Sequence, residues 1–156
     1  WTTHVSGTST TLDGIRDPHN FARYSPQHHL VWFGGGNGSR KTWRISQSGV
    51  ITPAADAPAA LGTLGPGGLG SSLIFTNPVD GTFIIIRNTT TWYTYDPIAN
   101  TWTQRTGVPH IAAANVFDST EPIWGTVAAP LPAYGVVAFV KGISRTAGAE
   151  MWLFKP

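Results

Sequence analysis

The sequence predicts an all-β protein built from three similar units of up to four strands each. Gly (18) and Pro (12) are abundant in the 156 residues, a composition typical of short strands joined by tight turns. No window of about a dozen residues repeats apolar side chains at the helical spacing i, i+3, i+4, i+7 without a Gly or Pro interrupting it. We therefore expect almost no helix. An internal repeat in the sequence defines the boundaries of the three units.

Three prolines mark the repeat, because Pro26, Pro78 and Pro130 follow one another at equal intervals of 52 residues. Proline has a fixed φ and no ladder donor, so it suits the turn between two strands. The strands expected before each proline are 20–24, 72–76 and 124–128, and those expected after it are 30–33, 83–86 and 136–140. The sequence therefore predicts a hairpin around each proline.

A third strand with a central aromatic residue follows each hairpin, at 42–45, 92–95 and 151–154. A fourth follows in the first two copies, at 50–52 and 101–105. Four strands in about 50 residues is the size of one β-propeller blade. We predict a single propeller region over 1–156, with repeats at approximately 18–53, 70–105 and 122–156.

The third copy stops before a fourth strand, and the other end of the chain carries a segment of the kind that it lacks. Trp1-Thr2-Thr3-His4-Val5-Ser6-Gly7 resembles Trp102-Thr103-Gln104-Arg105-Thr106-Gly107, which covers the fourth strand of the middle copy. We therefore expect 1–7 to be a closing strand that supplies the fourth strand of a last blade.

Several segments resemble kelch repeats. Phe33-Gly34-Gly35-Gly36 resembles the kelch diglycine, 92–102 resembles the signature in which Tyr and Trp flank a short turn, and Asp17-Pro18-His19-Asn20 resembles the entry to a first strand. The middle copy departs from the diglycine with Arg87-Asn88, and the third with Lys141-Gly142. The resemblance implies kelch-like blades of the galactose-oxidase-like central-domain type. A different propeller family and a β-sandwich are the alternatives.

A blade cannot bury both of its faces alone and becomes stable by stacking against neighbours. Aromatic residues are the expected filler between blades: Trp32, Phe33, Trp43, Phe75, Tyr95, Trp102, Phe139 and Trp152. Propellers have about four to eight blades, so three blades leave two exposed faces. We expect either a homodimer that completes a ring or the rest of a longer propeller chain as the partner, and no stable isolated monomer.

The chain has no Cys, which excludes a disulfide scaffold, a Cys-ligated metal and a thiol nucleophile. Kelch-like propellers include copper radical oxidases resembling galactose oxidase, whose cofactor is a cross-linked Cys–Tyr pair that this chain cannot build. The eight acidic residues are scattered, and His28 and His29 are adjacent, so in an extended chain they point to opposite sides. We expect no cofactor, no metal site and no identifiable catalytic residue.

One candidate binding site is expected where a first strand lines the central channel of a propeller. It would use Arg16, His19, Asn20 and Arg23. A structural role is the competing interpretation of His19, as a partner of neighbouring backbone in the kelch-like entry motif.

The net charge of +2 is too small and scattered to predict a nucleic-acid partner, and no apolar run approaches the ~20 residues of a membrane span. Charged residues are only 12% of the chain, which together with many polar uncharged residues favours an extracellular or secreted protein. The function predicted first is a non-catalytic binding or assembly module that presents blade loops, such as 37–41, 56–70 and 110–121, to a glycan or protein partner. The alternatives are part of a secreted carbohydrate-active enzyme, a propeller lyase or hydrolase with a channel-facing His/Arg site, and a structural subunit of a larger particle.

Overall fold

The computed structural model describes residues 12–17, 19–62, 72–87, 92–106, 126–142 and 148–156, and these form an all-β protein with three antiparallel sheets. The helical segments of the described residues are two 3-10 turns, Ala59–Leu61 and Pro132–Tyr134. No helix within this part of the chain could span a membrane. The expected closing strand 1–7 lies outside the described residues.

Sheet 1 has the strand order β1-β2-β3-β4. Its strands are β1 (Asn20–Ser25), β2 (Leu30–Gly35), β3 (Thr42–Ser46) and β4 (Ile51–Ala54). The glycines after Phe33 permit a close approach of backbones, because a Cβ on Gly34 would lie 2.4 Å from the Lys41 carbonyl oxygen and one on Gly36 would lie 1.7 Å from that of Arg16. The diglycine segment therefore has a packing reason in this chain.

Sheet 2 repeats this arrangement in the order β5-β6-β7-β8. Its strands are β5 (Leu73–Thr76), β6 (Phe83–Ile86), β7 (Trp92–Asp96) and β8 (Thr101–Arg105). The Asp96 Oδ1 accepts hydrogen bonds from the backbone N–H groups of Ile98 (2.8 Å) and Ala99 (2.9 Å), and Asn100 has a left-handed φ of 59°. Asp and Asn favour such turns, so these residues set the short connection between β7 and β8.

Sheet 3 has three strands in the described part of the chain, in the order β11-β10-β9. They are β9 (Thr126–Leu131), β10 (Val136–Gly142) and β11 (Ala149–Phe154). Pro130 was expected in a turn, but it lies in β9 and pairs with Val137, and the 3-10 turn Pro132–Tyr134 makes the connection instead. Proline is tolerated here because β9 is an edge strand of its sheet.

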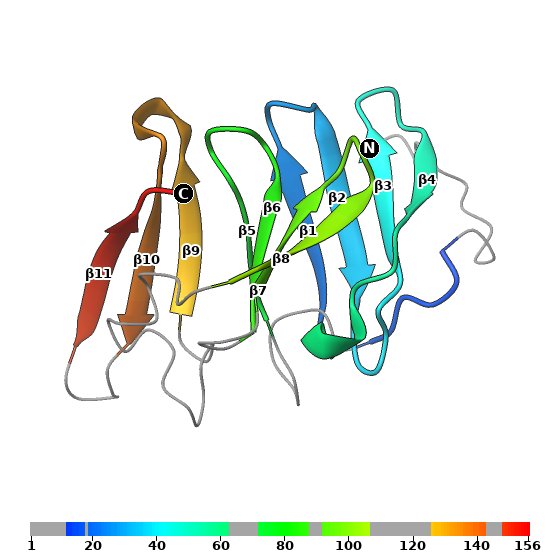
Figure 1. The fold of residues 1–156 in the computed structure, drawn as a ribbon, viewed down its shortest axis with the longest axis horizontal. Coiled ribbons are helices and arrows are strands. Elements are labelled where there is room, and N and C mark those ends of the chain that lie inside the picture. The colour runs from blue at the N-terminus through cyan, green and yellow to red at the C-terminus, as the bar shows by residue number, and fades with distance from the viewer. Residues whose placement is uncertain (1–11, 18, 63–71, 88–91, 107–125, 143–147) are drawn as a thin grey trace, which may run out of the picture.

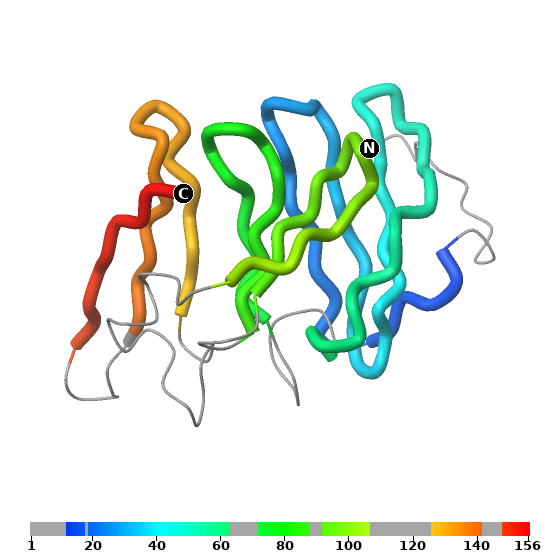
Figure 2. The backbone as a smooth tube through the Cα atoms, viewed as in Figure 1, coloured from blue at the N-terminus to red at the C-terminus, as the bar shows by residue number. Residues whose placement is uncertain are grey.

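The three sheets stand side by side in chain order, with sheet 2 between the other two (Figure 1). The strands of different sheets that come closest are the first strands, since β5 lies beside both β1 and β9. The backbone trace shows each sheet as an up-and-down meander, with sheets 1 and 3 at opposite ends of the long axis (Figure 2). The first strands therefore line one side of the stack.

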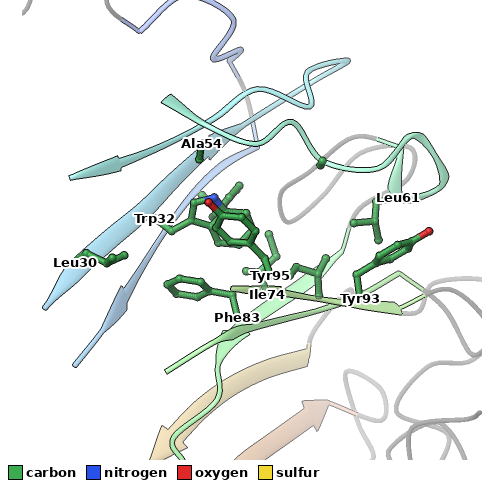
Figure 3. Packing of buried hydrophobic residues seen from close by; sticks show 11 residues of the cluster. Leu30, Trp32, Ala54, Leu61, Ile74, Phe83, Tyr93 and Tyr95 are labelled. Carbon is green, nitrogen blue, oxygen red and sulfur yellow. The ribbon is translucent and has the colours of Figure 1, made fainter. Parts of the chain in front are cut away.

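A single aromatic cluster fills the junction between sheets 1 and 2 (Figure 3). Trp32 is fully buried, and its ring lies 4.5 Å from that of Phe21, 5.0 Å from Phe83, 4.8 Å from Tyr95 and 5.5 Å from Trp102, measured between centroids. Three of these four partners, Phe83, Tyr95 and Trp102, belong to sheet 2, so both sheets contribute to this core. Aromatic pairs at such distances add about 0.5–1.5 kcal/mol each beyond the burial of their area.

The junction between sheets 2 and 3 has the same character. Phe75 of β5 is fully buried and lies 5.2 Å from the ring of Phe139 and 6.5 Å from that of Phe154. Ile84 and Ile86 of β6 complete this cluster from sheet 2. The strands β5 and β6 of sheet 2 are therefore covered on both faces, and every residue in them is buried.

Of the expected aromatic filler, Trp32, Phe75, Tyr95 and Phe139 are fully buried, and Trp102 and Trp152 pack against the two clusters. Phe33 and Trp43 differ. They oppose each other across β2 and β3 on the face of sheet 1 that points away from sheet 2, and they are only half-buried. Trp32 and Phe33 are adjacent in one strand and so must point to opposite faces.

Replacing Trp32 with Ala removes the central ring of the first cluster. We expect the free energy of unfolding to fall by about 3–5 kcal/mol, the usual cost of truncating a large core aromatic residue. Urea denaturation followed by fluorescence or circular dichroism measures this loss. Tyr134→Ala is the control, because Tyr134 is 77% exposed and its removal should change stability by no more than about 0.5 kcal/mol. Equal effects of the two substitutions would contradict the placement of the core.

Candidate functional site

Arg23 and Asn20, two of the predicted binding residues, point to opposite faces of β1. Phe21 and Ser25 are buried on the face toward sheet 2, and Arg23 shares that face, whereas Asn20 is exposed on the other. The Arg23 Nε donates a hydrogen bond to the Ile74 carbonyl oxygen at 2.7 Å, and its Nη1 donates to that of Ala22 at 2.8 Å. Burial lowers the pKa of the Arg23 guanidinium. Arg23 therefore ties β1 to β5.

The other two predicted residues lie at the start of β1. The backbone N–H of Arg16 donates to the Gly35 carbonyl oxygen at 3.0 Å, and Asn20 is the ladder partner of the same glycine. His19 is half-buried and has a left-handed φ of 76°. Arg16 and Asn20 thus both lie next to Gly35 through backbone pairing, whereas the Arg23 side chain points toward sheet 2. Ligand binding by these four residues stays a prediction.

An open depression of about 310 Å³ includes Asn20 on the outer side of sheet 1. Its other lining residues are Ile15, Phe21, Ala22, Phe33 and Gly34. Asn20 is the only side chain of this lining that carries a polar group, so the depression offers little that could orient a polar ligand.

Three described acidic residues serve turns or an ion pair: Asp80, Asp96 and Asp56. The Asp80 Oδ1 accepts from the Thr82 N–H at 2.9 Å and from its hydroxyl at 2.7 Å. Lys41 and Asp56 form an ion pair at 2.8 Å with both side chains exposed, which is worth only about 0–1 kcal/mol. The described residues contain no group of three His, Cys, Asp or Glu side chains placed to hold a metal ion.

Residues of the β7–β8 hairpin clamp the segment that follows β4. The Ala55 N–H donates to the Asn100 Oδ1 at 2.7 Å, and the Trp102 Nε1 donates to the Ala55 carbonyl oxygen at 3.1 Å. The Tyr95 hydroxyl donates to the same Asn100 Oδ1 at 2.8 Å. Sequence reasoning used Tyr95 and Trp102 only as apolar filler, although their kelch-like spacing around the turn was the available signal for this polar contact between sheets.

The phenol of Tyr95 in this clamp has a shifted pKa. Burial raises the pKa of its phenol to about 12, while the positive charge of Arg44 opposes the rise and the negative charge of Asp96 adds to it. Its ring is fully buried in the first aromatic cluster. A tyrosine held neutral in this way stabilises the junction and is not poised for proton transfer near pH 7.

Sheet 1 carries an apolar face on the side opposite sheet 2, on which no other described sheet packs, and we call it the upstream face. Its residues are ladder partners across the four strands: Ala22, Tyr24, Val31, Phe33, Trp43, Ile45, Ile51 and Pro53. None of them is fully buried, and Tyr24 is 53% exposed.

Sheet 3 carries the corresponding face on the side opposite sheet 2, which we call the downstream face. Its residues are Val127, Ala129, Leu131, Val136, Ala138, Val140, Ala149, Met151 and Leu153. Met151 is 67% exposed and Leu153 is 62% exposed. No charged residue occurs on either face within the described strands. Contiguous exposed apolar surface of this kind is a candidate interaction site.

Neither protein-family models nor curated proteins gave a match to this sequence. The upstream and downstream faces are the candidate functional site on the basis of the described structure alone.

The raised pKa of Tyr95 predicts a loss of stability in alkaline solution. The unfolded phenol ionises near pH 10 and the folded one near pH 12, so the folded state retains a proton that the unfolded state releases. The free energy of unfolding should be unaffected by this group below pH 10 and should decrease as the pH rises from 10 to 12.

Urea denaturation between pH 9 and pH 12 measures this decrease, compared with Tyr95→Phe. The variant should lose about 1 kcal/mol at neutral pH, because it lacks the hydrogen bond to Asn100. It should also show a weaker dependence on pH in the alkaline range. Identical pH profiles would contradict the assignment.

Proposed function

We propose that this chain is a non-catalytic assembly module: three blades of a kelch-like β-propeller whose upstream and downstream faces each bind a further blade. The chain-order stacking of three antiparallel sheets supports this, as does the approach of the first strands β1, β5 and β9 along one side of the stack. Innermost strands that gather around an axis are what a propeller requires.

The observation that carries the proposal is that both end sheets are apolar on the side that nothing described covers. The faces between sheets 1 and 2 and between sheets 2 and 3 pack against each other through aromatic and aliphatic side chains. Covering exposed apolar surface gains about 25 cal/mol for each Å² removed from water. Leu153 and Met151 on the downstream face are as exposed as residues in surface turns, so this gain is available on binding.

The connections between strands would form the ends of such an assembly and offer it a recognition surface for a protein or a glycan. The loop 37–41 is held firmly enough for this, since Ser39 is buried, its hydroxyl donates to the Gly14 carbonyl oxygen and it accepts from the Lys41 N–H at 3.1 Å. The expected loops 56–70 and 110–121 lie partly or wholly outside the described residues. Rigid loops on a repeat scaffold are common binding elements, and an extracellular setting fits the low content of charge.

A single engineered thiol tests whether the faces are covered, because the chain has no Cys of its own. Leu153→Cys places the thiol on the downstream face and Tyr134→Cys places it in the turn between β9 and β10, where the side chain is 77% exposed. We expect the purified Leu153→Cys protein to react with a thiol reagent at least about tenfold more slowly than Tyr134→Cys at high protein concentration, since assembly excludes the reagent.

Dilution should remove this protection and bring the two rates together. Equal rates at every concentration, in protein that is shown to be folded, would overturn the proposed function.

A further inference from the structure

We infer that the partner is a second copy of this chain, and that the downstream face of each copy packs on the upstream face of the other to close a ring of six sheets. The inference rests on the proposed function and names its partner. Three observations support it: the apolar chemistry of the two faces, the order in which the sheets stack, and the number of described sheets in one copy.

The chemistry of the faces specifies what can cover them. Apart from Asn20 at the start of β1, both consist of apolar residues, and neither has a charged side chain in the described strands, so the occupant must be a largely apolar surface of similar width. The junctions inside the chain show such an occupant, because the cluster around Phe75 is a sheet face packed on a sheet face. The chain itself offers two surfaces of this type on which no other described sheet packs.

The direction of stacking decides which faces meet. From sheet 1 to sheet 2 and from sheet 2 to sheet 3, the later side of one sheet packs on the earlier side of the next, with β1 beside β5 and β5 beside β9. Continuing this sequence places a new sheet 1 on the downstream face. Contact between two upstream faces or between two downstream faces would reverse the sense of stacking.

The number of described sheets is compatible with a ring of two copies. Closed propellers have about four to eight blades, the described residues of one copy form three sheets, and two copies of these give six. A contact between unlike faces closes into a ring when the rotation returns to its start and otherwise gives an open filament. Two copies related by a two-fold axis form both contacts at once and leave neither face exposed.

The test uses one charged substitution on each face at positions that are exposed in the single chain. Tyr24→Lys alters the upstream face and Leu153→Glu alters the downstream face, where the two side chains are 53% and 62% exposed. In a two-fold ring, either substitution enters both interfaces of the homodimer. We expect sedimentation to show a species of twice 16.7 kDa for the unaltered protein, and each variant alone to have its dimer dissociation constant raised by about a hundredfold or more.

Mixing the two variants should restore the dimer. One interface of the mixed dimer contains only unaltered faces, and the other places a lysine and a glutamate of opposite charge in the same contact. Ile98→Lys is the matched control, because Ile98 is 62% exposed in the β7–β8 turn and belongs to neither face, and this variant should remain dimeric.

Other results would contradict the pairing of unlike faces, the six-sheet ring or the assembly function itself. A dimer that survives Leu153→Glu but not Tyr24→Lys would show contact between two upstream faces, and the reverse pattern would show contact between two downstream faces. Larger or open-ended species that still protect the Leu153→Cys thiol would overturn the six-sheet ring and leave the proposed assembly function standing. A folded monomer in which that thiol is fully reactive would overturn both.

Discussion

The structure depends on one constraint: each sheet carries large apolar side chains on both faces, and burying them requires a neighbour on each side. Sheet 2 satisfies the constraint within the chain, and the complete burial of β5 and β6 follows from it. Among the described residues, sheets 1 and 3 satisfy it on one side only. The same physical force that stacks the three sheets therefore leaves a requirement at each end, and the proposed function and the proposed partner are two consequences of that requirement.

Much of the fold could be predicted from the sequence, because short apolar runs between Gly, Pro and Asp residues determine where strands start and stop. The hairpin of β5 and β6 lies where the proline register placed it, whereas Pro130 shows the limit of that register. A proline fits both a turn and an edge strand, and the choice depends on pairing across the whole hairpin. The expected helix content was also confirmed for the described residues.

The candidate site was harder to predict, because the direction of a side chain depends on strand register and on the neighbouring sheet. Arg23 and Asn20 were both assigned to one binding site lining a channel, which stays a prediction, and the alternation along β1 directs Arg23 to the Ile74 carbonyl oxygen. Phe33 and Trp43 were expected as filler between blades, but within one chain they form part of the upstream face. The sequence indicated two exposed faces from the repeat number, and only the structure identified their residues.

The sharing of Trp32 between two sheets also bears on how such a chain could gain or lose repeats over time. Its ring belongs to sheet 1, but its contacts with Phe83 and Tyr95 lie in sheet 2. A duplication or deletion that begins at a repeat boundary would divide this core, leaving one half-set of rings on each side of the break. The inherited unit that preserves packing is the junction, which joins the later face of one repeat to the earlier face of the next.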